Sequence, residues 1–536
     1  MKLRFLVLLC VLLAAGWTGA CAAERTTVLI YMCGSDLESD IGSATADLNE
    51  IIRADLPADG DVRVLVATGG AESWWTEEIS PDSLGIYEVN EEGLTRLEEF
   101  PLANMGQSDT LRDFLRYGLA QAPAERCLLV LWGHGMGAPG GVCLDARYEH
   151  DALMPEELRQ ALREALPGGK RLDAVVFDAC LMSDMETAEA LYGYADYMVA
   201  SQESTVGSGM EYDEWLGALS QDPGLDTESL CQTIVQTYID SNDHGIFSNY
   251  CTMSVLDVDA VPEVRQAVEK LSARLDARLA RDPDEVLDCR ASILSYGEYD
   301  DTGATDLVDA LLVAEAFAPL EPQACAQLRE AVRSMVLYNE TTEPMEGTSG
   351  GLSLTLPYAT SDWFYPFYER YEPLSDTSAY ARLVVHLAEA VEERDGITIF
   401  SFDWSLDSDE PAYIWDGLTE IGDAGSSAVP GDVSPDSSDI KDSLPTDPAD
   451  ASDPGTALND AAPDPSDIWD GLAGESPENT DDSEQQAGNS ERSSFDLWSL
   501  WDSLTAESAD VSDPGAAPGD AAPDPSDMWY GLTGEA

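Results

Sequence analysis

The sequence is poor in basic residues and in histidine. It has 27 Lys and Arg against 103 Asp and Glu, and only 4 His, which gives a formal net charge of -76. Such a surface repels phosphates, so nucleic acid is excluded as a partner. The charge suits a solvated protein and carries no information about the fold. With 536 residues the chain can bury a sizeable core and is too long for one ordinary domain.

Closely paired cysteines are also missing. The chain has 10 Cys, none in a CxxC pair, and their scattered spacing does not predict a disulfide framework. We expect most of them to be small buried residues. The side chains of Cys127, His134, Cys143 and His150 could in principle bind zinc, but their spacing fits no standard pattern. We therefore expect no metal site.

Long apolar runs are absent except at the N-terminus. Residues 1–23 combine two basic residues, an apolar run and small residues, a pattern typical of a secretory signal peptide. The run is shorter than the ~20 residues that a membrane span needs. Cys21 and the three residues before it resemble a bacterial lipobox, whose cysteine is lipidated after cleavage. We expect an exported protein, either secreted or tethered to the cell surface through a lipid on Cys21.

Residues 401–536 form an acidic, low-complexity segment in which only Lys441 and Arg492 are basic. Such a segment repels itself and has little to bury, so we expect it to be disordered. The stretch at 452–475 recurs at 512–535, each time with a tryptophan in an acidic setting. Two interpretations stay open: a duplicated solvated tail, or a series of docking motifs for an unknown partner.

Residues 24–400 alternate apolar strands with amphipathic helices. Such alternation predicts an α/β fold with a parallel sheet covered on both faces. We expect a core at about 26–260 and an additional sheet with helices at about 250–400. Strands are predicted at 26–32, 62–68, 127–135, 174–180 and 197–201, and helices at 108–122, 155–166 and 182–194.

Two of the predicted strands end in reactive side chains, His134 and Cys180. The functional crevice of an open α/β sheet lies beyond the carboxyl ends of its strands, so the two side chains can emerge side by side. A thiol beside an imidazole is a nucleophile beside a base. The N–H groups of Gly135 and Cys180 could hold an oxyanion. A helix starting directly after Cys180 would favour the thiolate. A packed cysteine and a satisfied histidine remain the alternative.

Five blocks carry a resemblance to a known family: YMCGSDLES, LWGHG, VVFDACLMSDMETA, YADYMVASQES and GLSLTLPY. In this order they resemble the clostripain-like cysteine peptidases, bacterial relatives of the caspases. The resemblance implies a caspase-like three-layer sandwich with a mainly parallel sheet. It also implies a His134–Cys180 dyad that needs no third catalytic residue and no cofactor. Some relatives depend on calcium, which the acidic tail could bind loosely.

The resemblance further implies an endopeptidase that cuts protein or peptide substrates after a basic residue. Asp178 matches the acidic residue of the pocket for that side chain, although it could instead cap the following helix. Ser201 and Glu203 begin the segment that lines this pocket in the family. After Glu203 the family often has Thr-Pro-Gly, whereas this chain has Ser-Thr-Val-Gly. The departure leaves the choice between Arg and Lys open.

Several family members cut themselves to mature. Arg147 lies in a Gly-rich, polar stretch after His134 that we expect to be an open loop, so it is the candidate self-cleavage site. Two other functions stay open. One is a catalytically idle surface binding protein, and the other is a peptidase of the same clan that cuts after Asn or Asp.

Overall fold

The computed structural model describes residues 25–395, except 58–59, 91–92, 167, 208, 246–247, 298–304 and 359–369. The predicted signal peptide with Cys21 and the acidic segment at 401–536 lie outside the described residues. Among the helices that are described, none has the length and apolar character needed to cross a membrane.

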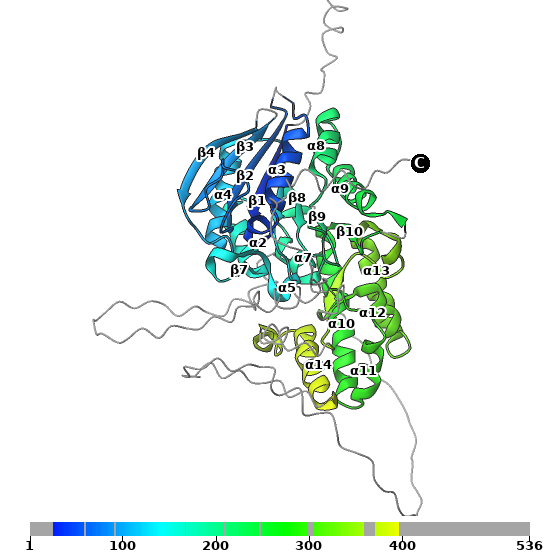
Figure 1. The fold of residues 1–536 in the computed structure, drawn as a ribbon. Coiled ribbons are helices and arrows are strands. Elements are labelled where there is room, and N and C mark those ends of the chain that lie inside the picture. The colour runs from blue at the N-terminus through cyan, green and yellow to red at the C-terminus, as the bar shows by residue number, and fades with distance from the viewer. Residues whose placement is uncertain are drawn as a thin grey trace, which may run out of the picture. The chain divides into compact units, whose positions relative to one another are not determined.

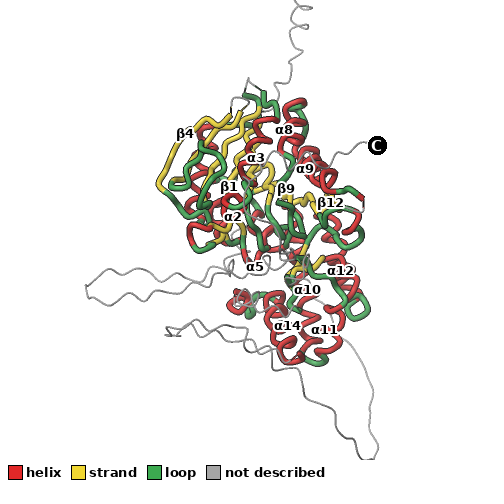
Figure 2. Tube along the Cα trace, viewed as in Figure 1, coloured by secondary structure: helices red, strands yellow, loops and turns green. Residues whose placement is uncertain are grey.

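A nine-stranded sheet lies at the centre of the described part of the chain (Figures 1 and 2). Its five central strands, β9, β8, β5, β1 and β2, are parallel, which confirms the predicted α/β fold with a mainly parallel sheet. Antiparallel strands extend both edges. In spatial order the strands are β12 (Val336–Thr341), β10 (Thr252–Asp257), β9 (Ala195–Ala200), β8 (Leu172–Asp178), β5 (Arg126–Trp132), β1 (Thr26–Cys33), β2 (Val62–Gly69), β3 (Ser83–Asn90) and β4 (Gly93–Pro101).

Helices cover both faces of the sheet, because the central strands are apolar on both sides. In β1, Val28 and Ile30 join a core that includes Trp215 of α8, whereas Leu29 faces Gly118 of α4. Successive strand residues point to opposite faces, so the sheet is the middle of three layers. One face carries α3 (Ser43–Arg53), α8 (Tyr212–Gln221) and α9 (Thr227–Asn242), and the other carries α4 (Ser108–Gln121), α6 (Pro155–Ala165) and α7 (Met185–Leu191).

The expected additional sheet after residue 250 is only partly present. β10 and β12 extend the main sheet, because β9 would otherwise leave its backbone N–H and C=O groups unpaired. Among the described residues after 250, only β11 (Leu307–Asp309) and β13 (Ser353–Thr355) form a separate small sheet. The helices of this region are α10 (Val261–Leu279), α11 (Pro283–Ala291), α12 (Ala310–Ala316), α13 (Pro322–Met335) and α14 (Ala379–Asp395).

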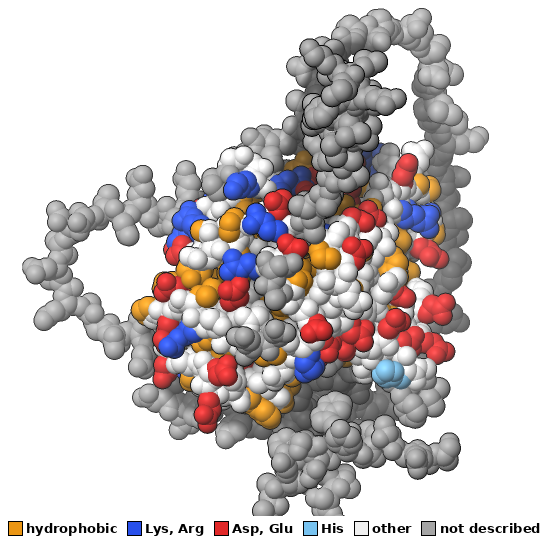
Figure 3. Space-filling view, turned by 90° about the horizontal axis from the view of Figure 1, so that it is seen from above, with side chains coloured by type: hydrophobic (Ala, Val, Ile, Leu, Met, Phe, Trp, Pro, Cys, Tyr) orange, Lys and Arg blue, Asp and Glu red, His pale blue; other side chains and the backbone are white. Residues whose placement is uncertain are grey.

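Figure 3 looks from above onto the end that is at the top in Figure 1 and shows both basic and acidic side chains, with acidic ones gathered toward its lower right. Ion pairs also join the amino ends of parallel strands to neighbouring segments. Arg63 pairs with Glu88 at 2.7 Å, and Arg171 pairs with Asp196 at 2.7 Å. The face in view therefore carries both signs of charge rather than one continuous acidic field.

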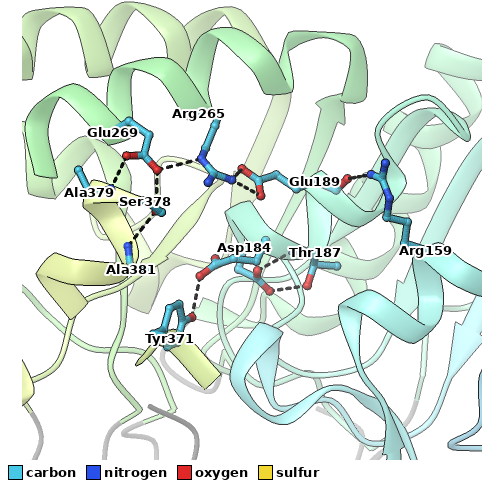
Figure 4. Close-up of polar contacts among 11 residues, drawn as sticks. Arg159, Asp184, Thr187, Glu189, Arg265, Glu269, Tyr371, Ser378, Ala379 and Ala381 are labelled. Carbon is cyan, nitrogen blue, oxygen red and sulfur yellow. Dashed lines mark hydrogen bonds and ion pairs between the residues drawn. The ribbon is translucent and has the colours of Figure 1, made fainter. Parts of the chain in front are cut away.

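Partly buried ion pairs and hydrogen bonds join α10, α14 and α7 (Figure 4). Arg265 of α10 donates to the Glu189 carboxylate of α7 at 2.6 Å. Glu269 of α10 accepts hydrogen bonds from the Ser378 hydroxyl at 2.6 Å and the Ala379 N–H at 2.7 Å, at the start of α14. The C-terminal helices are thus part of the same packed unit as the helix that follows Cys180.

Candidate active site

His134 and Cys180 lie at the same edge of the sheet, each two residues beyond a strand. β5 and β8 are parallel neighbours, and their last residues, Trp132 and Asp178, are paired across the ladder. The chain therefore leaves both strands at the same level. α2 (Ser35–Ser39) and α5 (Gly137–Gly140) lie at this edge (Figure 1).

The backbone after His134 touches the backbone at Cys180. A methyl group at Gly135 would lie 2.3 Å from the Cys180 carbonyl oxygen, so only glycine allows this approach. Within the described residues, neither the Gly135 N–H nor the Cys180 N–H donates a hydrogen bond. Two neighbouring N–H donors of this kind are what a tetrahedral oxyanion requires.

The imidazole of His134 is held by a carboxylate from a third strand end. Nε2 of His134 and Oδ1 of Asp36 are 2.7 Å apart, and both side chains are partly exposed. Burial raises the pKa of Asp36, but the hydrogen bond and the attraction of His134 outweigh it and lower that pKa to about 2. An ionised carboxylate only accepts, so Nε2 carries the proton. In the neutral ring, Nδ1 is then the proton acceptor.

Asp36 was missed by the sequence reasoning, which expected no third residue. The signal was available, because β1 is the other parallel neighbour of β5 and Asp36 follows its end closely. The argument from strand ends that selected His134 and Cys180 applies equally to Asp36.

The thiol of Cys180 is bonded to the segment that follows β9. The Thr205 N–H donates to Sγ at 3.2 Å, and the Thr205 hydroxyl lies 3.4 Å from it. Leu181 has a φ of 66°, an unfavourable value for a branched side chain, so the chain turns sharply directly after the thiol. The segment that carries Thr205 therefore fixes the position of the sulfur.

The expectation of a helix directly after Cys180 is wrong. α7 begins at Met185, five residues after Cys180, and the N–H of its third residue, Thr187, is already bonded to the side chain of Asp184. Burial raises the pKa of the Cys180 thiol, hydrogen bonds with Thr205 lower it in part, and the nearby carboxyl groups of Glu203 and Asp178 raise it. The thiol is thus neutral around pH 7, and its activation requires a base.

Asp178 is buried, with the Tyr212 hydroxyl as its hydrogen-bond partner. Its carboxylate accepts a hydrogen bond from the Tyr212 hydroxyl at 2.9 Å. Burial raises the pKa of Asp178 to about 7; the Tyr212 bond lowers it and the charge of Glu50 raises it. Asp178 does not cap α7, because Asp184 does.

Two further carboxyl groups near Asp178 were not predicted from the sequence. Asp47 of α3 accepts a hydrogen bond from the indole of Trp132 at 2.6 Å, and its other oxygen is buried. Burial and then the charge of Asp178 raise the pKa of Asp47, and burial raises the pKa of Glu50 to about 7. Three acids that hinder each other's ionisation form a region that favours a cation.

Ser201 and Glu203 make internal contacts that fix the segment after β9. The Ser201 side chain is fully buried and donates to the Glu203 carbonyl at 2.8 Å. The Glu203 carboxylate accepts from the N–H groups of Ser204 and Gly297, both at 2.8 Å. These bonds support the position of Thr205, and direct contact of either side chain with substrate stays a prediction.

The stretch after His134 is ordered rather than an open loop. It forms α5, the hairpin of β6 (Val142–Asp145) and β7 (Asp151–Leu153), and the short helix η1 (Ala146–Tyr148). Apolar side chains of β6 are fully buried, which its glycine content concealed. Arg147 lies at the tip, partly exposed and 3.6 Å from Asp82. Self-cleavage after Arg147 stays a prediction.

Two further histidines, His244 and His386, could also have served as bases, but among the described residues neither is bonded to a residue of this site. His386 is bonded to Asp276 on the C-terminal helices, and His244 is exposed. The eight cysteines in the described part of the chain are free, and six of them are buried. No group of three or more side chains suited to a metal occurs there. Calcium binding by the tail lies outside the described residues and stays a prediction.

Known proteins resemble this chain in sequence and in fold. Residues 30–388 match the model of the clostripain family, peptidase C11. The chain is 24% identical to clostripain of Hathewaya histolytica over 339 residues, which are 51% of this chain and 63% of that protein. The chain thus spans less than two thirds of that relative's length.

A solved structure has the same fold as this chain, and a second one is similar over part of this chain. An inactive zymogen C11 protease from Parabacteroides distasonis aligns with a TM-score of 0.50 and 20% identity, covering 67% of this chain and 98% of that one. A secreted C11 cysteine protease from Bacteroides thetaiotaomicron, in complex with an irreversible peptide inhibitor, aligns with a TM-score of 0.48 and 18% identity. That alignment covers 62% of this chain and 92% of the other.

Proposed function

The chain belongs to the clostripain family of cysteine peptidases, and on that premise we propose that it is an exported endopeptidase that cuts peptides after Arg or Lys. One observation carries the proposal. His134 and Cys180 follow the ends of two neighbouring parallel strands, and the Asp36 carboxylate is bonded to Nε2 of the imidazole. A base fixed in one tautomer beside a thiol is what acyl transfer requires.

In the proposed reaction, Sγ of Cys180 attacks the scissile carbonyl carbon while its proton passes to Nδ1 of His134. The carbonyl oxygen becomes an oxyanion that accepts hydrogen bonds from the N–H groups of Gly135 and Cys180. His134 then gives its proton to the leaving amine as the C–N bond breaks, which leaves a thioester. Water, deprotonated by His134, hydrolyses the thioester and restores the thiol. Asp36 stabilises the imidazolium in both steps.

The preference for a basic side chain rests on the carboxyl groups around Asp178. A guanidinium or ammonium group would replace protons that Asp178 and Glu50, with pKa values raised to about 7, hold near neutral pH, and it would pair with Asp47, whose pKa burial also raises. An aspartate side chain would be repelled there, and an asparagine would gain no charge pairing. The same pocket could accept Arg147 of another copy during self-processing, which mass spectrometry of the wild type and Cys180→Ala would compare.

A fluorogenic panel tests the proposal. Otherwise identical peptides ending in Arg, Lys, Asn or Asp before the reporter are offered to wild type and to Cys180→Ala. We expect Cys180-dependent release with Arg and Lys only. Release with Asn or Asp would contradict the basic preference, and no release at all would favour the idle binding protein.

A further inference from the structure

Two large apolar side chains are unusually exposed near the candidate site. Ile41 is 60% exposed and Trp75 is 55% exposed, the highest values among the large hydrophobic residues that the structure describes. They lie together, because a methyl group at Gly42 would be only 2.5 Å from the Trp75 ring. Leaving both in water costs free energy that a bound apolar group would recover. We name this pair the Ile41–Trp75 ledge.

The ledge is rigidly built. Glu38, which is fully buried, accepts a hydrogen bond from the Trp75 N–H at 2.7 Å and one from the Thr45 hydroxyl at 2.6 Å. Ser39 accepts from the N–H of Glu72 at 2.9 Å. Two residues of α2 thus fix the Trp75 loop, so the indole is held in place before any ligand arrives, which lowers the entropic cost of binding.

The ledge is continuous with the catalytic groups. α2, which fixes Trp75, also carries Asp36, the partner of His134. The side chain of Ile41 lies 3.8 Å from where a methyl group at Gly207 would be, and Gly207 is two residues beyond Thr205. The ledge therefore borders the segment whose N–H holds the nucleophile.

The ledge is also connected to the carboxyl groups around Asp178, through α3 and through the segment at 207–209. Ile41 directly precedes Gly42 and α3, the helix that carries Asp47. Gly209, two residues beyond Gly207, lies against the Asp47 carboxylate. A substrate residue that inserts its basic side chain toward this pocket would bring the preceding residues over the ledge.

We propose that Ile41 and Trp75 form a subsite for an apolar side chain on the acyl side of the scissile bond, next to the basic residue. The inference rests on the proposed peptidase function and adds a second determinant of its specificity. It predicts that an aliphatic side chain before the basic residue raises kcat/KM roughly tenfold over a polar isostere, since burial of one aliphatic group is worth that much.

The test compares kcat/KM for peptides that have Leu or Asn at each of the three positions before Arg, in the full chain. The variants are Trp75→Ala, Trp75→Phe and Ile41→Ala. The matched control is Phe100→Ala, since Phe100 is 42% exposed on the edge strand β4. We expect a preference for Leu at the position directly before Arg in wild type, in Trp75→Phe and in the control. The ratio of kcat/KM for the Leu peptide to that for the Asn peptide should fall toward one in Trp75→Ala and Ile41→Ala.

Three outcomes would overturn the subsite. One is an absence of preference in wild type, and another is a preference that the ledge variants keep. A third is an equal rise in kcat/KM for all peptides in Trp75→Ala, which would mean that another part of the chain or a second copy covers the ledge. These results leave Cys180-dependent cleavage intact.

Failure of the proposed peptidase function gives a different result, because no peptide would then be cleaved, and the subsite proposal would fail with it. Equal thermal unfolding of the variants verifies folding.

Discussion

Two acidic residues near the nucleophile serve opposite purposes, and their surroundings set them apart. Asp36 is bonded to an imidazole and has a pKa lowered to about 2, so it is a permanent anion. Asp178 is buried without a cationic partner, and its pKa is raised to about 7. Asp36 can hold a base in place, and Asp178 can bind a cation.

Replacing Asp36 tests its role as a positioning residue. Asp36→Asn can still accept from Nε2 but removes the charge that stabilises the imidazolium. We expect kcat to fall roughly 10- to 100-fold, part of the 10²–10⁴-fold that a positioned base contributes, with little change in KM. Asp40→Asn, an exposed change at the end of the same helix, is the control. An unchanged kcat in Asp36→Asn would show that the hydrogen bond is only structural.

The raised pKa of Asp178 predicts a pH-dependent preference. Only the carboxylate pairs with guanidinium, so the ratio of kcat/KM for an Arg peptide to that for its neutral citrulline analogue should fall as pH drops through about 7. Taking this ratio cancels the pH dependence of the chemical step, which both peptides share. Asp178→Asn should make the ratio low and independent of pH. A ratio in wild type that stays constant between pH 5 and 8 would contradict the account.

The same carboxyl group should reduce stability at high pH. Its pKa is raised in the folded protein relative to the usual 3.8, so its contribution to folding is complete below about pH 4. That contribution is lost as pH rises through about 7. Asp178→Asn should therefore raise the unfolding temperature more at pH 8 than at pH 5. A larger gain at pH 5 would argue against this assignment.

At the scale of elements, the central strands and helices could be predicted because their patterns are strong. The five parallel strands are near-continuous apolar runs, and α4 and α6 have clear apolar faces. β3 and β4 could not be predicted from the sequence, since β4 is an exposed, charged edge strand without an apolar pattern. The start of α7 was misplaced, because the turn at Leu181 and the cap at Asp184 depend on tertiary contacts.

The loops after β5 and β8 touch at Gly135 and Cys180, so adding one methyl group at Gly135 should disturb both of them. Gly135→Ala would place that methyl 2.3 Å from the Cys180 carbonyl oxygen, so the loops must separate. We expect a loss of about 1–3 kcal/mol in stability, as for other overpacked sites, together with loss of activity. Gly217→Ala, inside α8, is the control, because a methyl group there would come no closer than 3.9 Å to its nearest neighbour, the Ala54 carbonyl oxygen; it should gain about 0.5–1 kcal/mol. Equal behaviour of the two variants would contradict the proposed contact.

For the whole molecule, the net charge of -76 bears on how substrates arrive. A negatively charged protein raises the local concentration of cationic peptides, and salt screens this effect over ~8 Å at physiological ionic strength. We expect KM for an Arg peptide to rise with salt in the full chain. Removal of 401–536 should weaken that dependence while kcat stays the same, because the candidate site lies within residues 36–212. An identical salt dependence of both forms would exclude such steering by the tail.

The central claim is that His134 and Cys180 act as one unit at the edge of the sheet. The most direct test is labelling by an arginyl acyloxymethyl ketone, with the modified residue mapped by peptide mass spectrometry. The account predicts one label per chain, on Cys180, with labelling lost in Cys180→Ala and strongly slowed in His134→Ala. A label on another cysteine, or a rate that His134→Ala leaves unchanged, would contradict it.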